Sequence, residues 1–454
     1  MVIVAELLPN LKSFLRGVGL SEAAHAMVIR MVVAFVLHAG RMSCMQAAGA
    51  VQSDPRHRAQ VSRFLARPRW RKADINSMLR QRLLDCETGT GLFLFIVDAT
   101  LNGQSGKKTK NTYSTGNRKR RRKKGRRYGK NKHAKKSCHS FTVGLLITPS
   151  GVRVPFSKAH YTREYCKDHD LEHRTSAEAA ADLIRELPLP EDAQVVVLGD
   201  TAYDAQVVRD ACQERHYTWI FPANAERVLA GPKGERPKLR TLLKDWSTWS
   251  RQTIRLVPSE GEFAVYRRLS AHRVGPKVKP RTYYVHQEKR QVHSIGKVRI
   301  VFSTTKENLK TATADDVKIL LTNDLKLSVR KVVELYSLRW QIELFFKELK
   351  STLGFNQYQF QKFEAVEGWL DMVLTTFLYL EWFRVQQLSR RGLSDKEKTW
   401  WRHQRTYGLC QAIRQICKTK ELEYIAKRVE TPGGIAKLKR ILRNAVAGEY
   451  RVKV

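Results

Sequence analysis

The sequence predicts an α/β fold in which a mixed β-sheet is interrupted by a β-rich insertion and flanked by helical N- and C-terminal regions. Three observations predict it. Apolar residues recur at helical spacing over residues 1–90 and again from Leu327 onward. Two continuous apolar runs, GLFLFIVDA from Gly91 and AQVVVLGD over 193–200, end in aspartate, as a strand buried on both faces would. Alternating runs, typical of half-buried strands, occupy residues 203–325.

The charge of the chain indicates a polyanionic partner. The sequence carries 83 Lys and Arg against 43 Asp and Glu, a formal net charge of +40. A surface this positive repels itself unless a polyanion covers it. Nucleic acid is the first choice of partner, and an anionic membrane surface is the weaker one.

The basic charge is densest in one low-complexity segment, residues 107–136, which holds sixteen Lys and Arg and no acidic residue. It lies between two predicted core strands, so its attachment point reaches their edge. We expect it to contact DNA phosphates, although such runs also occur as solvated tails or import signals. The cations that we expect to bind DNA are Arg118, Arg120, Arg121, Arg122, Lys123, Lys124, Arg126 and Arg127.

The N-terminal helices are predicted to form a DNA-binding domain. SEAAH at Ser21 fits a helix start, and the run Ala26–Ala39 is too short and too charged to span a membrane, which indicates a core helix. Two further periodic stretches, Met42–Val51 and Ala59–Leu65, flank a turn-prone Ser-Asp-Pro at 53–55, with arginines nearby. This pattern fits a helix-turn-helix-like module, and a small bundle with solvated arginines is the alternative.

The central part of the chain has the strand order of a layered α/β core. FTVGLLIT (141–148) and GVRVPF (151–156) are predicted to be antiparallel neighbours, followed by a helix over 176–187 and the strand 193–200. This order matches the first half of a ribonuclease H-like arrangement. The insertion is predicted to hold the strands QTIRLV, FAVYRRL, RTYYVH, KVRIVFST and VKILLTN, and Glu367–Arg384 to be an amphipathic helix. The predicted division is 1–90 for the helical DNA-binding domain, 91–202 for the first part of the core, 203–325 for the β-rich insertion, 326–385 for the second part of the core, and 386–454 for a basic helical C-terminal region.

The cysteine and histidine patterns predict neither disulfides nor a zinc site. Seven cysteines are scattered without a CxxC pair, which is typical of reduced thiols in the cytoplasm. His160, Cys166, His169, Asp170 and His173 lie within fourteen residues, but their spacings match no zinc pattern. We interpret this segment as a polar loop.

Two carboxylates stand at positions that suit metal-dependent cleavage of a phosphodiester. Asp98 and Asp200 each follow a buried apolar run. If the two strands are neighbours, both side chains lie at the same edge of the sheet, where a pair of Mg²⁺ ions needs hard oxygen ligands. A strand-ending aspartate also serves as a turn residue or helix cap, so that reading stays open.

The segment YSLRWQIELFFKELK, residues 336–350, is predicted to be one helix with a polar stripe. At helical spacing the stripe places one carboxylate among cations, which suits a metal ligand flanked by phosphate-binding groups. The alternative is a surface helix with Glu–Lys pairs. The stripe comprises Tyr336, Arg339, Trp340, Glu343, Lys347 and Lys350.

The pattern Tyr336-x2-Arg339-x3-Glu343-x6-Lys350 resembles the YREK signature of bacterial insertion-sequence DDE transposases. VDAT at Asp98, LGDTAYD at Asp200 and ILLTNDL before the helix resemble that group too. The resemblance covers about residues 91–385 and implies a ribonuclease H-like core with a β-rich insertion domain. The basic run 107–136 is longer than the family pattern suggests.

The resemblance implies roles for individual residues. Asp98, Asp200 and Glu343 are expected to be catalytic and to hold two Mg²⁺ or Mn²⁺ ions. The residues expected to bind DNA phosphates are Tyr336, Arg339, Lys350 and, one helical turn after Glu343, Lys347. Trp340 is expected to pack beneath the site, with stacking on a base as the alternative, and Trp246 and Trp249 are candidates for stacking on an extruded base.

The implied activity is cut-and-paste DNA transposition. The expected substrate is double-stranded DNA, namely transposon terminal inverted repeats and target DNA, held by a homodimer in the synaptic complex. The expected location is the bacterial cytoplasm, in association with the nucleoid. A repurposed nuclease of the same fold and a non-catalytic DNA-binding protein are the alternatives.

Overall fold

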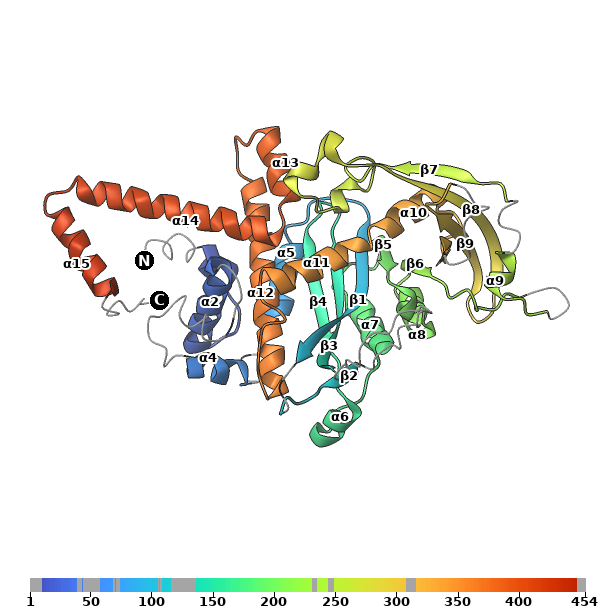
Figure 1. The fold of residues 1–454 in the computed structure, drawn as a ribbon, viewed down its shortest axis with the longest axis horizontal. Coiled ribbons are helices and arrows are strands. Elements are labelled where there is room, and N and C mark those ends of the chain that lie inside the picture. The colour runs from blue at the N-terminus through green and yellow to red at the C-terminus, as the bar shows by residue number, and fades with distance from the viewer. Residues whose placement is uncertain are drawn as a thin grey trace, which may run out of the picture.

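A ten-stranded mixed sheet forms the body of the protein, with helices on both faces (Figure 1). The computed structural model describes residues 10–38, 43, 58–67, 70, 74–104, 106, 108–115, 136–230, 235–243, 249–307 and 316–446. Along the path of the sheet the strands run β2-β3-β1-β5-β6-β10-β9-β8-β7, with β4 paired to β3.

The centre of the sheet consists of five strands in the order β4-β3-β1-β5-β6. They are β1 (Phe93–Gln104), β3 (Lys136–Ile147), β4 (Arg153–Ala159), β5 (Val195–Leu198) and β6 (Thr218–Pro222). Strand β3 is antiparallel to β1 and β4, whereas β1, β5 and β6 are parallel. The predicted hairpin of β3 and β4 is confirmed. This is the ribonuclease H-like α/β arrangement that the sequence predicts.

The remaining strands extend the same sheet rather than forming a separate one. Short β2 (Tyr113–Thr115) shares the outer edge of β3 with β4. On the other side, β10 pairs with β6, and β9, β8 and β7 follow in antiparallel order. Their bounds are β7 (Gln252–Leu256), β8 (Arg281–Val292), β9 (Gly296–Thr304) and β10 (Lys318–Thr322). Strands β6 and β10, which fall within the predicted insertion, therefore pair with the core strands directly.

One predicted strand of the insertion is absent, since FAVYRRL contains the 3-10 turn η6 (Ala264–Tyr266) instead. Phe263 and Tyr266 are both buried although they are three residues apart. That spacing places two side chains on one side of a 3-10 turn, whereas on a strand they would face opposite sides. The strand prediction for this segment is wrong.

Helices cover the two faces of the sheet, as neighbouring residues of β3 show. Phe141 packs on Phe363 of α12, and the hydroxyl of Thr142 donates a hydrogen bond to the carbonyl of Ser176 in α7. Successive residues of a strand point to opposite faces, so α7 and α12 lie on opposite sides. The covering helices are α7 (Ser176–Arg185), α8 (Gln206–Glu214), α10 (Val329–Ser337), α11 (Trp340–Ser351) and α12 (Phe363–Leu388).

Helix α12 is the central helix of the molecule and lies between the sheet and the N-terminal helices (Figure 1). The prediction that it is amphipathic is wrong, because most of its side chains are buried all round. Its N-terminal partners are α2 (Glu22–Leu37), α4 (Arg58–Leu65) and α5 (Ile75–Leu84). Gly368 lets α4 approach closely, since a Cβ there would lie 2.4 Å from the carbonyl oxygen of Leu65.

The predicted helix starting after Ser21 is confirmed, with the Ser21 hydroxyl accepting a hydrogen bond from the N–H of Ala24. The predicted helix over Met42–Val51 and the Ser-Asp-Pro turn at 53–55 lie outside the described residues, except for Ser43. The chain ends in α13 (Asp395–His403), α14 (Thr406–Val429) and α15 (Gly434–Val446), and α14 projects from the body (Figure 1). None of the helices in the described ranges has the length and apolar character needed to cross a membrane.

Of the histidine and cysteine side chains in the 160–173 segment, His160 and Cys166 are buried and His169 is exposed. The prediction of a loop is wrong for part of it, because α6 (Arg163–His169) begins after the N-cap Thr162. His160 is buried, and its two ring nitrogens lie 2.8 Å and 2.5 Å from the hydroxyls of Ser140 and Thr142. Burial lowers the pKa of His160 to about 4, so the ring is neutral near pH 7.

Candidate active site

Asp98 and Asp200 lie side by side where the pairing of two parallel strands ends. The last paired residues of β1 and β5 are Ile96 and Leu198, each two residues before an aspartate. The two strands are neighbours, so the condition under which both side chains lie at the same edge of the sheet is met. The prediction that the first strand ends at Asp98 is wrong, because its pairing with β3 continues to Gln104.

Each aspartate also makes a local hydrogen bond. One oxygen of Asp98 accepts from the N–H of Ala99 at 2.8 Å. One oxygen of Asp200 accepts from the N–H of Ala202 at 2.9 Å and caps the 3-10 turn η3 (Thr201–Tyr203). The alternative reading of a capping aspartate is thus partly correct for Asp200. The local bonds occupy one oxygen of each carboxylate.

The segment predicted as a single helix over 336–350 is two helices, α10 and α11, that meet at Leu338 and Arg339. At the junction the N–H groups of Leu338, Arg339, Gln341 and Ile342 bond to carbonyls three residues back rather than four. This tightening places Tyr336 in the last turn of one helix and Glu343 in the first turn of the next.

Arg339 joins the carboxylates of two distant parts of the chain. Its Nη1 lies 3.3 Å from Oδ2 of Asp98, and its Nη2 lies 2.5 Å from Oε1 of Glu343. The guanidinium is mostly buried, as is the Asp98 carboxylate. The planar guanidinium of Arg339 thereby contacts Asp98 with one nitrogen and Glu343 with the other.

The surroundings of Asp98 raise its pKa to about 6. Burial is the main cause, the charges of Asp200 and Glu343 add to it, and the N–H of Ala99 and the charge of Arg339 oppose it. Burial likewise raises the pKa of Tyr336 to about 12, with Arg339 as a lowering neighbour. The three carboxylates therefore belong to one electrostatic site.

The expected phosphate-binding side chains do not converge in this arrangement. Tyr336 is buried, and Lys350 donates to the carbonyl oxygen of Leu101 at 3.1 Å. Burial lowers the pKa of Lys350. Lys347 points to solvent. Arg339 is held by carboxylates. Of the four side chains predicted to bind phosphates, Lys347 is the one that is exposed.

The predicted packing of Trp340 is wrong, because 55% of this residue is exposed. It lies at the first position of α11, beside Arg339 and at the rim of a pocket of about 270 Å³ that Tyr283 and Lys318 also line. Trp249 instead packs between His286 and Phe302 of the insertion strands, with ring centroids 4.3 Å and 4.7 Å away. Trp246 and the cations Arg118 to Arg127 lie outside the described residues.

Lys318 is a site residue that sequence reasoning missed. It begins β10, and its Nζ lies 5.0 Å from the centroid of the Tyr336 ring. Burial and the charge of Arg339 lower its pKa, and Glu343 raises it. Its only sequence signal is that it starts the VKILLTN strand.

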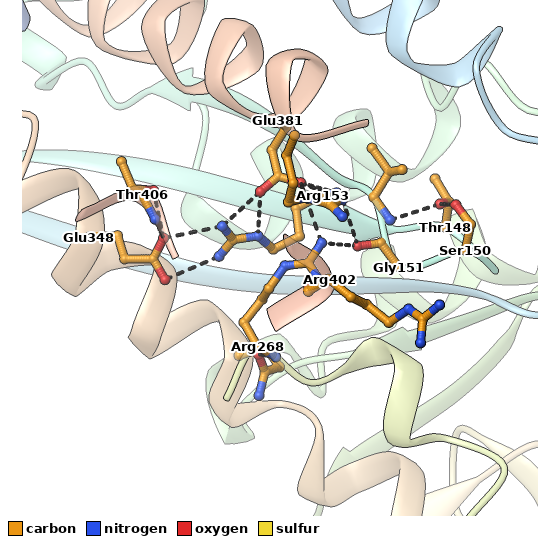
Figure 2. Close-up of polar contacts among 12 residues, drawn as sticks. Thr148, Ser150, Gly151, Arg153, Arg268, Glu348, Glu381, Arg402 and Thr406 are labelled. Carbon is orange, nitrogen blue, oxygen red and sulfur yellow. Dashed lines mark hydrogen bonds and ion pairs between the residues drawn. The ribbon is translucent and has the colours of Figure 1, made fainter. Parts of the chain in front are cut away.

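A buried network of charges fixes α11 from below (Figure 2). Arg153 on β4 forms ion pairs with Glu348 of α11 at 3.1 Å and with Glu381 of α12 at 2.8 Å. Glu381 also pairs with Arg384 at 3.0 Å and with Arg268 at 3.4 Å. All five side chains are buried. Burial lowers the pKa of Arg153, but Glu348 and Glu381 raise it by more, so the pKa lies above its usual value and the guanidinium stays charged.

The network also reaches the C-terminal helix. Glu348 accepts hydrogen bonds from the N–H of Thr406 at 3.0 Å and from its hydroxyl at 2.6 Å. Arg268 donates to the backbone carbonyls of Gly151 and Arg402, as Figure 2 shows. The helix that carries Glu343 is thereby tied to the sheet, to α12 and to the first turn of α14.

The donor set suits a hard divalent cation, although the carboxylates are not closed around one position. Three carboxylates and no thiolate or imidazole are the ligand chemistry of Mg²⁺ and Mn²⁺. In the described ranges, no group of three His, Cys, Asp or Glu side chains is close enough to hold a metal ion. The gap between Asp98 and Glu343 is taken by Arg339.

Asp98 and Asp200 follow the paired ends of two neighbouring strands, and Arg339 links Asp98 to Glu343. Carboxylates from distant parts of a chain are also what metal-dependent enzymes use to act on phosphodiesters. Comparison with known families agrees. The chain belongs to the DDE superfamily endonucleases, whose model matches residues 14–250, more than half of its length. A second model, that of the transposase DDE domain, matches residues 165–379. Asp98 lies in the first range, Glu343 in the second and Asp200 in both. No curated protein matches the chain.

Proposed function

We propose that the protein is a DDE transposase that cuts DNA at transposon ends and joins those ends to target DNA. The observation that supports it most is the Arg339 bridge between Asp98 and Glu343, with Asp200 on the neighbouring strand. Membership of the DDE superfamily endonucleases makes DNA the substrate. The match to the transposase DDE domain favours transposition over simple cleavage.

In this proposal Asp98, Asp200 and Glu343 hold two Mg²⁺ or Mn²⁺ ions, which supply an activated oxygen nucleophile and a stabilised leaving oxygen when bound. Water cuts one strand at each end, and the freed 3′-hydroxyl attacks the target phosphodiester in line. Once released from the two carboxylates, the Arg339 fork contacts a phosphate with both of its arms. Lys347, already exposed on the same helix, contacts the backbone beside it.

The two ends of a transposon have to be held together, so the proposal includes a homodimer. Leu422, Ile425 and Val429 of α14 are exposed and lie at helical spacing on the projecting helix. Such an apolar stripe favours association with a second chain. The N-terminal helices and the basic run 107–136 would bind the terminal repeats, in bacterial cytoplasm where nucleoid DNA is accessible.

A matched pair of variants tests the proposed function. With DNA that carries the element's own ends, Glu343→Gln should reduce Mg²⁺-dependent cleavage by about a hundredfold to a thousandfold, because a metal contributes several kcal/mol to such a step. End binding should stay intact. Glu334→Gln, which removes one charge from α10, is the control. Cleavage by Glu343→Gln at the wild-type rate would remove Glu343 from the site.

The alternatives separate in the same experiment. With pre-cleaved ends, a transposase yields joined product, whereas a repurposed nuclease of this fold cuts without joining. A non-catalytic DNA-binding protein gives neither product, with Mg²⁺ or with a chelator.

A further inference from the structure

A second cleft lies where the C-terminal helices meet the segment around Ala271–Arg273. Its volume is about 1120 Å³, and it opens between the 3-10 turn η7 (Ala271–Arg273), the end of α13 and the first turns of α14. Helix α13 is seen at the top of Figure 1, and α14 runs from the body toward the left. The cleft is lined by aromatic and cationic side chains, among them His272, Trp400, Tyr407, Arg405, Arg414 and Lys418.

Two of the lining rings are exposed to an unusual degree. Among the large hydrophobic side chains of the described ranges, the exposed aromatic ones are Trp340, Trp400 and Tyr407, at 55%, 39% and 57%. Trp400 is held edge-on against Trp401, with ring centroids 4.7 Å apart. The Tyr407 hydroxyl accepts a hydrogen bond from Gln411 at 2.8 Å. Rings that are fixed by neighbours and still exposed present a stacking surface at low entropic cost.

Within the described residues, carbonyl oxygens rather than carboxylates hold the guanidinium groups of the cleft, although the charge of Glu348 acts on Arg405 from nearby. Arg405 donates two hydrogen bonds to the carbonyl oxygen of Arg268, and Arg414 donates to the carbonyls of Val36 and His38. Carbonyl partners hold a guanidinium in place without cancelling its charge. No acidic residue lines the cleft in the described part of the chain. The cleft is therefore positive as well as aromatic.

Exposed aromatic faces beside cations that form no ion pair in the described part of the chain match one kind of ligand, a nucleic-acid strand whose bases are unpaired. Unpaired bases stack on such rings, and the strand phosphates meet the cations. A duplex hides the base faces, so it would leave Trp400 and Tyr407 unused. The position agrees, because the N–H of Arg268 donates to Gln341 of α11 at 2.9 Å while its carbonyl holds Arg405. Arg268 thus connects α11, the helix of Glu343, to Arg405 of the cleft through two hydrogen bonds.

We propose that this cleft is a second DNA site, which binds an unpaired strand segment by stacking its bases on Trp400 and Tyr407. It rests on the proposed function in that the strand is taken to be transposon or target DNA opened near the carboxylates. The cleft and the carboxylates are separate sites, so each can fail without the other.

The test measures binding of full-length protein to a fluorescein-labelled oligothymidine of about 12 nucleotides, within the usual range of single-strand site sizes. Tyr407→Ala and Trp400→Ala should each weaken binding by about fivefold to a hundredfold, since one stacked base contributes that much. Tyr407→Phe keeps the ring and should bind like wild type. Leu171→Ala, another exposed apolar side chain, is the matched control.

Heparin, a polyanion without bases, separates stacking from charge. Both alanine variants should bind heparin like wild type, and Lys418→Ala should weaken heparin and oligothymidine alike. Oligothymidine binding by both alanine variants within about twofold of wild type would overturn the proposal. Equal loss of heparin binding, or a changed oligomeric state with unchanged DNA binding, would also overturn it and assign the cleft to folding or to a protein partner.

Glu343→Gln distinguishes this proposal from the proposed function. It should bind oligothymidine normally while it fails to cut. If wild type cuts and joins DNA but the cleft variants bind normally, only the second site is lost. If wild type neither cuts nor joins DNA but Tyr407→Ala loses oligothymidine binding, the proposed DNA site in the cleft is supported and the proposed transposase function is refuted.

Discussion

Replacing Arg153 by Met tests whether the buried network stabilises the fold around α11, the helix that carries Glu343. The Arg153 side chain donates four hydrogen bonds, two to Glu348 and two to Glu381, at 2.8–3.2 Å. After the change Glu381 keeps its pairs with Arg384 and Arg268. Glu348 keeps the hydrogen bonds from Thr406 and, in the described part of the chain, has no other ion pair. The buried Glu348 carboxylate thereby loses its ion pair, with Arg405 and Arg268 acting on it only from farther away.

Removing one partner of a buried ion pair costs about 3–5 kcal/mol, a large part of the about 5–15 kcal/mol that stabilises a typical protein. Urea unfolding at neutral pH, followed by circular dichroism, should show this loss for Arg153→Met. Adding Glu348→Gln should recover at least about 1 kcal/mol, because the stranded charge is gone. Arg185→Met, at the exposed pair with Glu214, is the control and should unfold like wild type. A loss below about 1 kcal/mol, or a further loss on adding Glu348→Gln, would refute this reasoning.

Three further outcomes follow from the site and the core. The pKa of Asp98 is raised to about 6, and only its ionised form binds a cation, so Mn²⁺ affinity should fall by about tenfold per pH unit below pH 6. Calorimetry without DNA measures this affinity, and an affinity that does not change with pH would contradict the role of Asp98 as a metal ligand. Arg339→Ala should bind Mn²⁺ about three- to tenfold more tightly without DNA, since the guanidinium competes for two carboxylates, and equal or weaker binding would count against that competition. Gly368→Ala should lower the free energy of unfolding by about 1–3 kcal/mol, because the new Cβ would clash with the Leu65 carbonyl oxygen. Gly103→Ala is the control and should unfold like wild type, since a Cβ there has no neighbour within 4 Å. Equal melting temperatures for the two variants would mean that α4 does not pack closely on α12 at Gly368.

The buried strands were predictable because they depend on local apolar runs. The two runs before Asp98 and Asp200 identify strands buried on both faces, whereas their adjacency depends on long-range pairing and could only be stated as a condition. The length of β1 was not predictable, since the polar residues up to Gln104 stay in the strand only because β3 pairs with them. The break between α10 and α11 left no trace either, because a change from four-residue to three-residue hydrogen bonding at Leu338 and Arg339 alters no side-chain pattern.

Charged contacts between distant segments were beyond sequence reasoning. Arg153 lies in a run that reads as a plain apolar strand, and its partners Glu348 and Glu381 follow 195 and 228 residues later. Which carboxylate meets which guanidinium depends on how α11 and α12 cross the sheet. The exposure of Trp340 was missed for a related reason, since aromatic side chains are usually core and only the start of α11 at that residue brings this one to the rim.

The single continuous sheet has a mechanical consequence. Strand β10 is hydrogen-bonded to β6 over Ile220–Pro222 on one side and to β9 over Arg299–Ser303 on the other. The outer strands cannot hinge away at β10, because separating the paired strands would leave backbone N–H and C=O groups without hydrogen-bond partners. A movement of β7, β8 and β9 relative to Asp98 and Asp200 therefore requires either broken backbone hydrogen bonds or bending of the whole sheet.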